Sequence, residues 1–196
     1  WPTLFYMDPH QSKPTACVWV KVDPQDGWWQ IAEAEIAGDA AAVKRAVERV
    51  EQDLALEVTW RKADPKITAQ TNQFAQRFES QLFTIKQAFD EVGFSFEPAN
   101  TNFSVAIERL EQALVPNPHT RVPRLRVHRT CRRTIYQVSR FTWDRDKPSR
   151  EHSDFPACLR YLAMDDPDWR SLQALRHGRG VQIGAGGQGR NPRTGW

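Results

Sequence analysis

The 196-residue sequence contains no apolar run that approaches the roughly 20 residues of a membrane-spanning helix, and its start shows no signal peptide. Cysteine is scarce: Cys17, Cys131 and Cys158 are odd in number, widely separated and without zinc-binding spacing. We expect buried thiols in a protein of a reducing compartment. A Gly-x-x-x-x-Gly-Lys-Ser/Thr phosphate loop and a convincing catalytic triad are also missing, so the chain by itself is not an NTPase.

The composition is otherwise ordinary, with 40% hydrophobic and 26% charged residues, and the length fits one domain. The net charge of +3 is uneven, because residues 119–150 carry nine Arg and one Lys against two Asp. Residues 176–196 add four Arg, no acid and seven of the ten glycines. We therefore expect a domain of residues 1–175, a flexible basic tail of residues 176–196 and a polyanionic partner. The chain opens on Trp1 within an apparent strand, which suggests a piece of a longer protein.

The first part of the sequence predicts three antiparallel strands. Residues 3–8 and 16–23 are rich in apolar and β-branched side chains, as is typical of buried strands. The Asp26-Gly27 pair marks a hairpin turn into a third strand at residues 28–36. Three consecutive strands joined by short turns indicate an antiparallel meander.

The pattern then changes from strand to helix and back. Apolar residues at helical spacing follow Asp39 and predict an amphipathic helix to about residue 54. Residues 56–62 return to alternation, which places Val58 and Trp60 on one face of a fourth strand. That strand stops at Asp64-Pro65, because proline cannot donate a hydrogen bond to a sheet.

The remaining elements complete an α/β fold. Helices are expected at residues 82–92, 103–114, 130–141 and from 152 onward, and short strands at 94–96 and 124–128. Three antiparallel strands followed by a crossover to a parallel strand is the order of a ribonuclease H-like fold, a mixed sheet flanked by helices.

Three acids stand where such a fold would bring them together. Asp8 ends the first strand, Asp64 ends the fourth, and Asp154 begins the closing helix. The first and fourth strands are neighbours in a ribonuclease H-like sheet, so the carboxylates would converge on one edge. Carboxylate oxygens suit Mg²⁺ or Mn²⁺. Two such ions, about 3.5–4 Å apart, can activate a water and stabilise the leaving oxygen of a phosphodiester.

Each acid also has a purely structural explanation. Asp8 and Asp64 precede proline and could simply begin turns, as Asp23 and Asp166 could. Asp154 could cap its helix or complement the helix dipole. Only the joint placement of the three acids favours a metal site.

Four segments make a comparison with a known family possible: Asp8-Pro9-His10 with Lys13-Pro14, the Val-x-Asp-Pro end of the second strand, Arg61-x-x-Asp64-Pro65, and His152-x-Asp154 followed by Leu159-Arg160-Tyr161. Over about residues 4–165 the chain resembles the nuclease domain of the large terminase subunits of tailed bacteriophages. The last motif of that family is His-x-Asp-x-x-x-x-Leu-Arg-Tyr. One position departs from the family, since Ala157 stands where many members have a further Asp.

The resemblance implies a metal-dependent endonuclease that cuts concatemeric double-stranded DNA at the start and end of packaging. Asp8, Asp64 and Asp154 would be the catalytic residues and would hold Mg²⁺ or Mn²⁺, with two ions expected. An ATPase domain would precede Trp1, and the portal protein and the small terminase subunit would be partners. No membrane is implied, and the location would be the cytoplasm of the infected bacterial host.

Several basic residues are candidates for contacts with DNA phosphates: Lys13, His152, Arg129, Arg132 and Arg133. Each could equally be a solvated side chain, or in the case of His152 a residue that only hydrogen-bonds at the start of a helix. Glu33 and Glu35 could add a metal ligand or simply face solvent.

Two other functions remain open from the sequence alone. A non-catalytic module could use its arginines to dock on DNA or on the portal ring, with the acids serving as turn and cap residues. Another ribonuclease H-like enzyme, of the resolvase, integrase or transposase type, would share the three acids and differ in its substrate.

Overall fold

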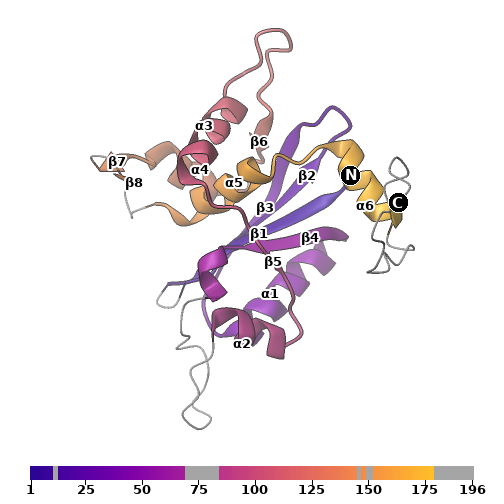
Figure 1. The fold of residues 1–196 in the computed structure, drawn as a ribbon, viewed down its shortest axis with the longest axis vertical. Helices are drawn as coiled ribbons and strands as arrows, with labels where there is room; N and C mark the ends of the chain where they lie inside the picture. Colours follow the sequence, from indigo (N-terminus) through magenta and orange to yellow (C-terminus); the bar gives the residue numbers. More distant parts are fainter. Residues whose placement is uncertain (11–12, 69–83, 145–146, 149–151, 179–196) are drawn as a thin grey trace, which may run out of the picture.

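A mixed sheet of six strands, in the order β5-β4-β1-β2-β3-β6, forms the centre of the molecule (Figure 1). The computed structural model describes residues 1–10, 13–68, 84–144, 147–148 and 152–178. The strands are β1 (Thr3–Asp8), β2 (Thr15–Val22), β3 (Trp28–Ile36), β4 (Val58–Ala63), β5 (Glu97–Pro98) and β6 (Leu125–Val127). The predicted α/β fold with a mixed sheet is confirmed.

The sheet combines an antiparallel meander with parallel outer strands. β1 pairs antiparallel with β2, and β2 pairs antiparallel with β3, whereas β4, β6 and β5 run parallel to their neighbours β1, β3 and β4. The hairpin between β2 and β3 turns at Asp26, which adopts a positive φ of 61° next to Gly27. Because β1 and β4 are parallel, their carboxyl ends reach the same edge of the sheet.

Helices cover both faces of the sheet, as Figure 1 shows. They are α1 (Ala40–Asp53), α2 (Ile85–Glu91), α3 (Phe103–Leu114), α4 (Arg132–Arg140), α5 (Asp154–Asp165) and α6 (Trp169–Gly178), with a 3-10 turn at Pro65–Thr68. One face of the sheet packs against α3 and α5 through Tyr6, Val18 and Leu159. The other face packs against α1 and α2 through Phe5, Trp19 and Val43. The short strands β7 (Trp143–Asp144) and β8 (Lys147–Pro148) form a separate pair.

Most predicted helices begin and end where local signals place them. Asp39 accepts a hydrogen bond from the backbone N–H of Ala42 and caps α1. Thr84 and Gln87 form a reciprocal capping box at the start of α2. Gly93 ends α2 with a positive φ of 69°, which glycine adopts without strain. The first residues of the helix predicted at 82–92 lie outside the described part of the chain.

Two details differ from the sequence-based expectation. The predicted strand at residues 94–96 is not a strand, because Phe94 and Phe96 are buried in an aromatic cluster and β5 begins only after them. Val58 and Trp60 do not share a face. The pairing of β1 with β4 shifts by one residue between these positions, so Val58 packs on the α1 side and Trp60 on the α5 side.

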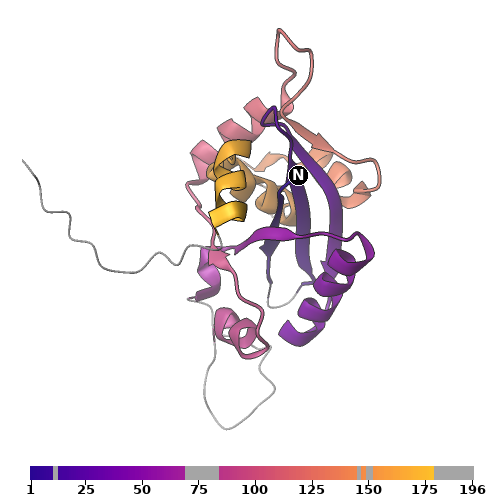
Figure 2. The same ribbon diagram turned by 90° about the vertical axis from the view of Figure 1, so that its right-hand side faces the viewer.

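The C-terminal part of the described chain adds a helix that the apolar pattern did not predict. α6 (yellow in Figure 2) lies beside β4, and Arg176 donates to Glu57 at 2.6 Å. The predicted basic tail, apart from its first three residues, lies outside the described residues. All three cysteines are buried and free, as expected. None of the helices in the described ranges has the length and apolar character needed to cross a membrane.

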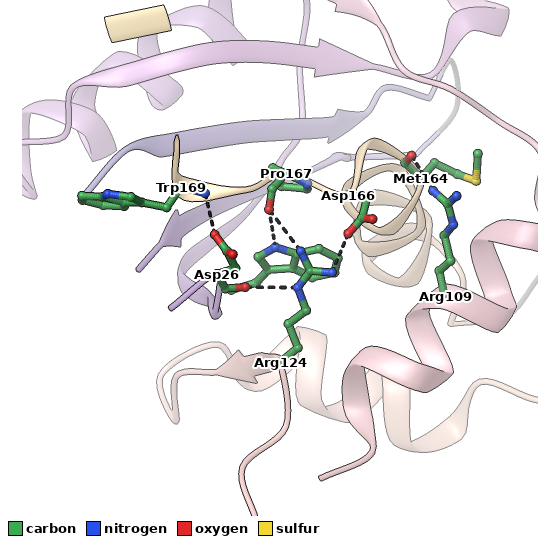
Figure 3. Close-up of polar contacts among 8 residues, drawn as sticks. Asp26, Arg109, Arg124, Met164, Asp166, Pro167 and Trp169 are labelled. Carbon is green, nitrogen blue, oxygen red and sulfur yellow. Dashed lines mark hydrogen bonds and ion pairs between the residues drawn. The ribbon is translucent and has the colours of Figure 1, made fainter. Parts of the chain in front are cut away.

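α5 is held at its C-terminal end by two arginines from other elements (Figure 3). Its last turn contains no basic residue, and Asp166 ends it in a left-handed conformation. Arg109 donates to the carbonyl oxygen of Met164 at 3.1 Å, and Arg124 donates to Asp166 at 2.5 Å and to the carbonyl oxygen of Pro167 at 3.3 Å. The contact with Met164 satisfies a carbonyl group that the helix leaves unpaired, and the two guanidinium charges complement the helix dipole.

Candidate metal centre

The three acids singled out in the sequence come from three elements that meet at one edge of the sheet. Asp8 is the last residue of β1, Asp64 directly follows β4, and Asp154 is the first residue of α5. Met7 of β1 lies opposite Ala63 of β4, which makes Asp8 and Asp64 the next residues at the ends of two adjacent parallel strands. Because proline follows both acids, neither strand continues beyond them.

The start of α5 lies over this edge. The Sγ atom of Cys158, one turn into the helix, lies 3.6 Å from the carbonyl oxygen of Ala16, and Ala16 is the partner of Asp8 in the β1–β2 pair. The buried stripe of α5, which includes Phe155 and Leu159, packs into the core on this side of the sheet. The helix therefore brings Asp154 toward Asp8.

The electrostatics of Asp8 show that the three carboxylates lie near one another. Burial raises the pKa of Asp8 most, and the negative charges of Asp64 and Asp154 raise it further, from 3.8 to about 7. The charges of Arg160 and Lys13 act in the opposite direction. A buried carboxylate that two other carboxylates repel favours a proton or a cation.

Two basic residues offset part of that charge. The Nζ atom of Lys13 lies 3.7 Å from Oδ1 of Asp154, and the Lys13 side chain is 44% exposed. Arg160 lies on α5 with its guanidinium 4.6 Å from the centre of the Phe103 ring. Sequence reasoning assigned Arg160 no role, although it stands within the closing motif two residues after Cys158.

The structural explanations of the acids also hold in part. Oδ1 of Asp64 accepts a hydrogen bond from the backbone N–H of Lys66 at 2.8 Å, which is the contact of an Asp-Pro turn. Asp154 occupies the first turn of α5, where a negative charge complements the helix dipole. These local contacts orient the acids and are compatible with a shared site.

The acids fit a divalent cation in donor type and charge. Oxygen ligands from carboxylates are those that Mg²⁺ and Mn²⁺ prefer, and a cation would relieve the repulsion that raises the pKa of Asp8. Among the described residues, however, no group of three or more His, Cys, Asp and Glu side chains is arranged to hold an ion as it stands. The described side chains therefore do not form a ready-made ion site.

The remaining predicted residues lie around α4 and the start of α5. His152 adopts a left-handed φ of 58°, and its ring lies 5.1 Å from that of Tyr136. Arg129 and Arg132 are exposed. Arg133 is also exposed, but its guanidinium forms an ion pair with Glu35.

Glu33 has a specific structural task that the sequence did not indicate. Its two carboxylate oxygens accept hydrogen bonds from the backbone N–H groups of Arg133 and Thr134, at 2.8 and 2.7 Å. Glu33 thus caps the N-terminus of α4 from β3. The side chain is engaged with that helix and does not simply face solvent.

A cleft of about 710 Å³ lies at the other end of α5, away from the acids. Trp28, Arg109, Arg124 and Asp166 are among its lining residues, and the arginines there are occupied with the end of the helix. The edge of the sheet where Asp8, Asp64 and Asp154 lie, which we call the acid edge, is not part of this cleft.

The chain resembles two solved large terminases in structure. The nuclease domain of the P22 large terminase superposes with a TM-score of 0.60 at 16% identity, over 89% of this chain and 86% of that domain. The large terminase of a thermophilic bacteriophage superposes with a TM-score of 0.62 at 14% identity, over 83% of this chain. The match covers only 39% of that longer protein. No protein-family model and no curated protein matches the sequence. The chain therefore has the fold of the nuclease domain of bacteriophage large terminases, as its sequence motifs led us to expect.

Proposed function

We propose that this chain is a metal-dependent endodeoxyribonuclease that hydrolyses double-stranded DNA, as the nuclease domain of a bacteriophage DNA-packaging terminase. The observation that supports the proposal is the position of Asp8 at the end of β1, of Asp64 directly after β4 and of Asp154 at the start of α5, in a fold shared with the P22 nuclease domain. These acids come from β1, β4 and α5, which are far apart in sequence. Their mutual repulsion is costly unless a cation compensates it.

The three acids would hold Mg²⁺ or Mn²⁺, and two ions are expected. When bound, such ions polarise the phosphodiester and supply an activated water. Asp8 must lose its proton before it can serve as a ligand, so its raised pKa makes ion binding dependent on pH. Asp64 is held by its turn and Asp154 by its helix, so both present carboxylates from fixed backbone positions.

The chain's own cations would act on the substrate. Lys13 lies beside Asp154 and is exposed, so its ammonium group can turn from that acid to a DNA phosphate. His152 stands two residues before Asp154 and can donate a hydrogen bond to a phosphate or a water. Arg160 lies close enough to offset the charge of Asp8, which reduces the repulsion of an approaching phosphate.

Arg129, Arg132 and Arg133 would contact the DNA backbone next to the acid edge. Contacts of this kind position DNA without reading its sequence and make binding sensitive to salt. Arg133 is paired with Glu35, so it would have to exchange that partner for a phosphate. Arg129 and Arg132 have no ion-pair partner among the described residues.

The wider setting follows from the same proposal. The match covers 39% of the large terminase of the thermophilic bacteriophage, and the resemblance in sequence implies an ATPase domain in the same full-length chain. The portal protein and the small terminase subunit would be further partners. The site of action would be the cytoplasm of the infected bacterial host.

Cleavage of supercoiled plasmid tests the proposal. The parent should nick and linearise plasmid with Mn²⁺ or Mg²⁺ and leave it intact with EDTA. Asp8→Asn, Asp64→Asn and Asp154→Asn should each abolish cleavage, because each removes a ligand charge. Asp53→Asn is the matched control, since that side chain is 70% exposed at the end of α1. Cleavage by the three site variants at the parental rate would refute the assignment.

A non-catalytic docking module is the second candidate. It is favoured by the finding that no ready-made metal cluster exists among the described residues. That function predicts a melting temperature that Mn²⁺ leaves unchanged. The nuclease predicts an increase, because a ligand that binds only the folded state stabilises it.

A further inference from the structure

The outer face of α4 carries basic and apolar side chains in unusual exposure. The helix contains three arginines and no acid, and only Thr134 is buried. Ile135 is 44% exposed and Tyr136 is 47% exposed. Tyr136 and Ile135 thus lie next to one another in sequence on a cationic surface helix, where they are accessible to a partner.

Two hydrogen-bond anchors fix α4 relative to the acid edge. Glu33 holds its first turn, as described above. In the middle of the helix, Oε1 of Gln137 accepts a hydrogen bond from the backbone N–H of Phe155 at 3.0 Å. Phe155 follows Asp154, so the exposed face of α4 is held beside the start of α5.

Tyr136 lies between two potentially cationic groups. The guanidinium carbon of Arg140 is 4.0 Å from the centre of the Tyr136 ring. The His152 ring is 5.1 Å from the Tyr136 ring and nearly perpendicular to it, at 88°. His152 in turn stands two residues before Asp154. We call Arg140, Tyr136 and His152 the α4 ledge.

The guanidinium groups of Arg133 and Arg140 differ in their partners among the described residues. Arg133 at the start of the same helix is neutralised by Glu35, but Arg140 has no carboxylate partner among the described residues. Contact with the Tyr136 ring orients the guanidinium and leaves N–H groups free to bind two oxygens of one phosphate.

We propose that the α4 ledge binds the phosphate backbone of one DNA strand next to the point of cleavage. Arg140 makes the phosphate contact, and Tyr136 is a positioning residue that holds Arg140 and His152 in line with the acid edge. DNA is chosen as the occupant because the ledge is cationic, lacks acids and is adjacent to the three carboxylates. The inference rests on the proposed function for the identity of its substrate, and it adds two residues that the sequence did not indicate.

Binding of a fluorescent duplex, measured by anisotropy in metal-free buffer, tests the ledge without relying on cleavage. Arg140→Gln should weaken binding by roughly five- to tenfold. It should also reduce the salt slope, which is the steepness with which the logarithm of the binding constant falls with the logarithm of the salt concentration, by about 1, as expected for one lost phosphate contact. Tyr136→Ala should weaken binding similarly, whereas Tyr136→Phe retains the ring and should bind like the parent. The double variant Tyr136→Ala/Arg140→Gln should lose less affinity than the product of the two single losses, because Tyr136 acts in part through Arg140.

Arg49→Gln is the matched control, since it removes an exposed arginine from α1 on the other face of the sheet. Melting temperatures close to the parental value will show that the variants fold. Parental affinity and salt slope in Arg140→Gln would overturn the proposal, as would equal losses in Tyr136→Phe and Tyr136→Ala. If the ledge variants lose affinity while the parent cuts no DNA with any metal, the ledge stands and the nuclease proposal fails. If the parent cuts DNA and the ledge variants bind with parental affinity, the nuclease proposal stands and the ledge proposal fails.

Discussion

Replacement of Asp8 by asparagine should stabilise the metal-free protein at neutral and alkaline pH. Burial and the charges of Asp64 and Asp154 raise the pKa of Asp8 from 3.8 to about 7. A pKa difference of about 3 corresponds to about 4 kcal/mol of unfolding free energy as an upper limit. Between these two pKa values the folded protein binds more protons than the unfolded chain. The stability of the parent therefore falls as the pH rises from about 4 to about 7.

Thermal unfolding in EDTA measures this effect. Asp8→Asn carries no charge to repel Asp64 and Asp154, so it escapes the loss of stability. For a protein of this size, about 4 kcal/mol corresponds to roughly 8–16 °C in melting temperature. We expect the variant to exceed the parent by up to that amount near pH 8 and to approach it near pH 4. Asp53→Asn should follow the parent throughout.

Mn²⁺ should reduce the stability advantage of Asp8→Asn over the parent. A cation competes with the proton for Asp8, so it should stabilise the parent more at about pH 8 than at about pH 6. At 100 times the dissociation constant the gain would be about 2.7 kcal/mol. Asp8→Asn should gain less. The reasoning is refuted if the parent in EDTA is as stable at high pH as at low pH and the variant runs parallel to it.

Three further perturbations probe the framework around the site. Arg124→Ala should lower the free energy of unfolding by about 1–2 kcal/mol, measured by urea titration, because it removes partly exposed contacts to the end of α5. Glu33→Ala should cost about 1–2 kcal/mol and speed amide hydrogen exchange of Arg133 and Thr134, since it removes the cap of α4. The thiols should resist Ellman's reagent until the protein unfolds, because burial raises the pKa of each; Cys158 is fully buried.

The elements that carry the acids could be predicted because their signals are local. A run of apolar residues defines β1, and the proline after Asp8 ends it. The same stop signal acts at Asp64, and helical spacing marks α5. The adjacency of β1 and β4 was expected from the ribonuclease H-like fold that the order of the elements indicates, and the pairing of the two strands confirms it. The sequence could not show whether the carboxylates are close enough to influence one another. In the structure, the charges of Asp64 and Asp154 add to the effect of burial in raising the pKa of Asp8.

What could not be predicted depends on contacts between distant segments. The face of Trp60 is reversed by the one-residue shift in pairing with β1, which no pattern within β4 reveals. Glu33 looks like an ordinary exposed strand residue until α4, about 100 residues later, places two N–H groups against it. Arg160 reaches the charge of Asp8 only because α5 packs across the sheet in one orientation.

The two-ended attachment of α5 has a mechanical consequence. The helix is about 18 Å long at 1.5 Å per residue, and contacts with other elements hold it in place at both ends. Gln137 forms a hydrogen bond with its first turn, and Arg109 and Arg124 form hydrogen bonds with its C-terminal end. The strands that carry Asp8 and Asp64 are bound to each other along their length. Under the proposed function, an arriving ion would meet a backbone that is already fixed, so its binding would cost little backbone conformational entropy.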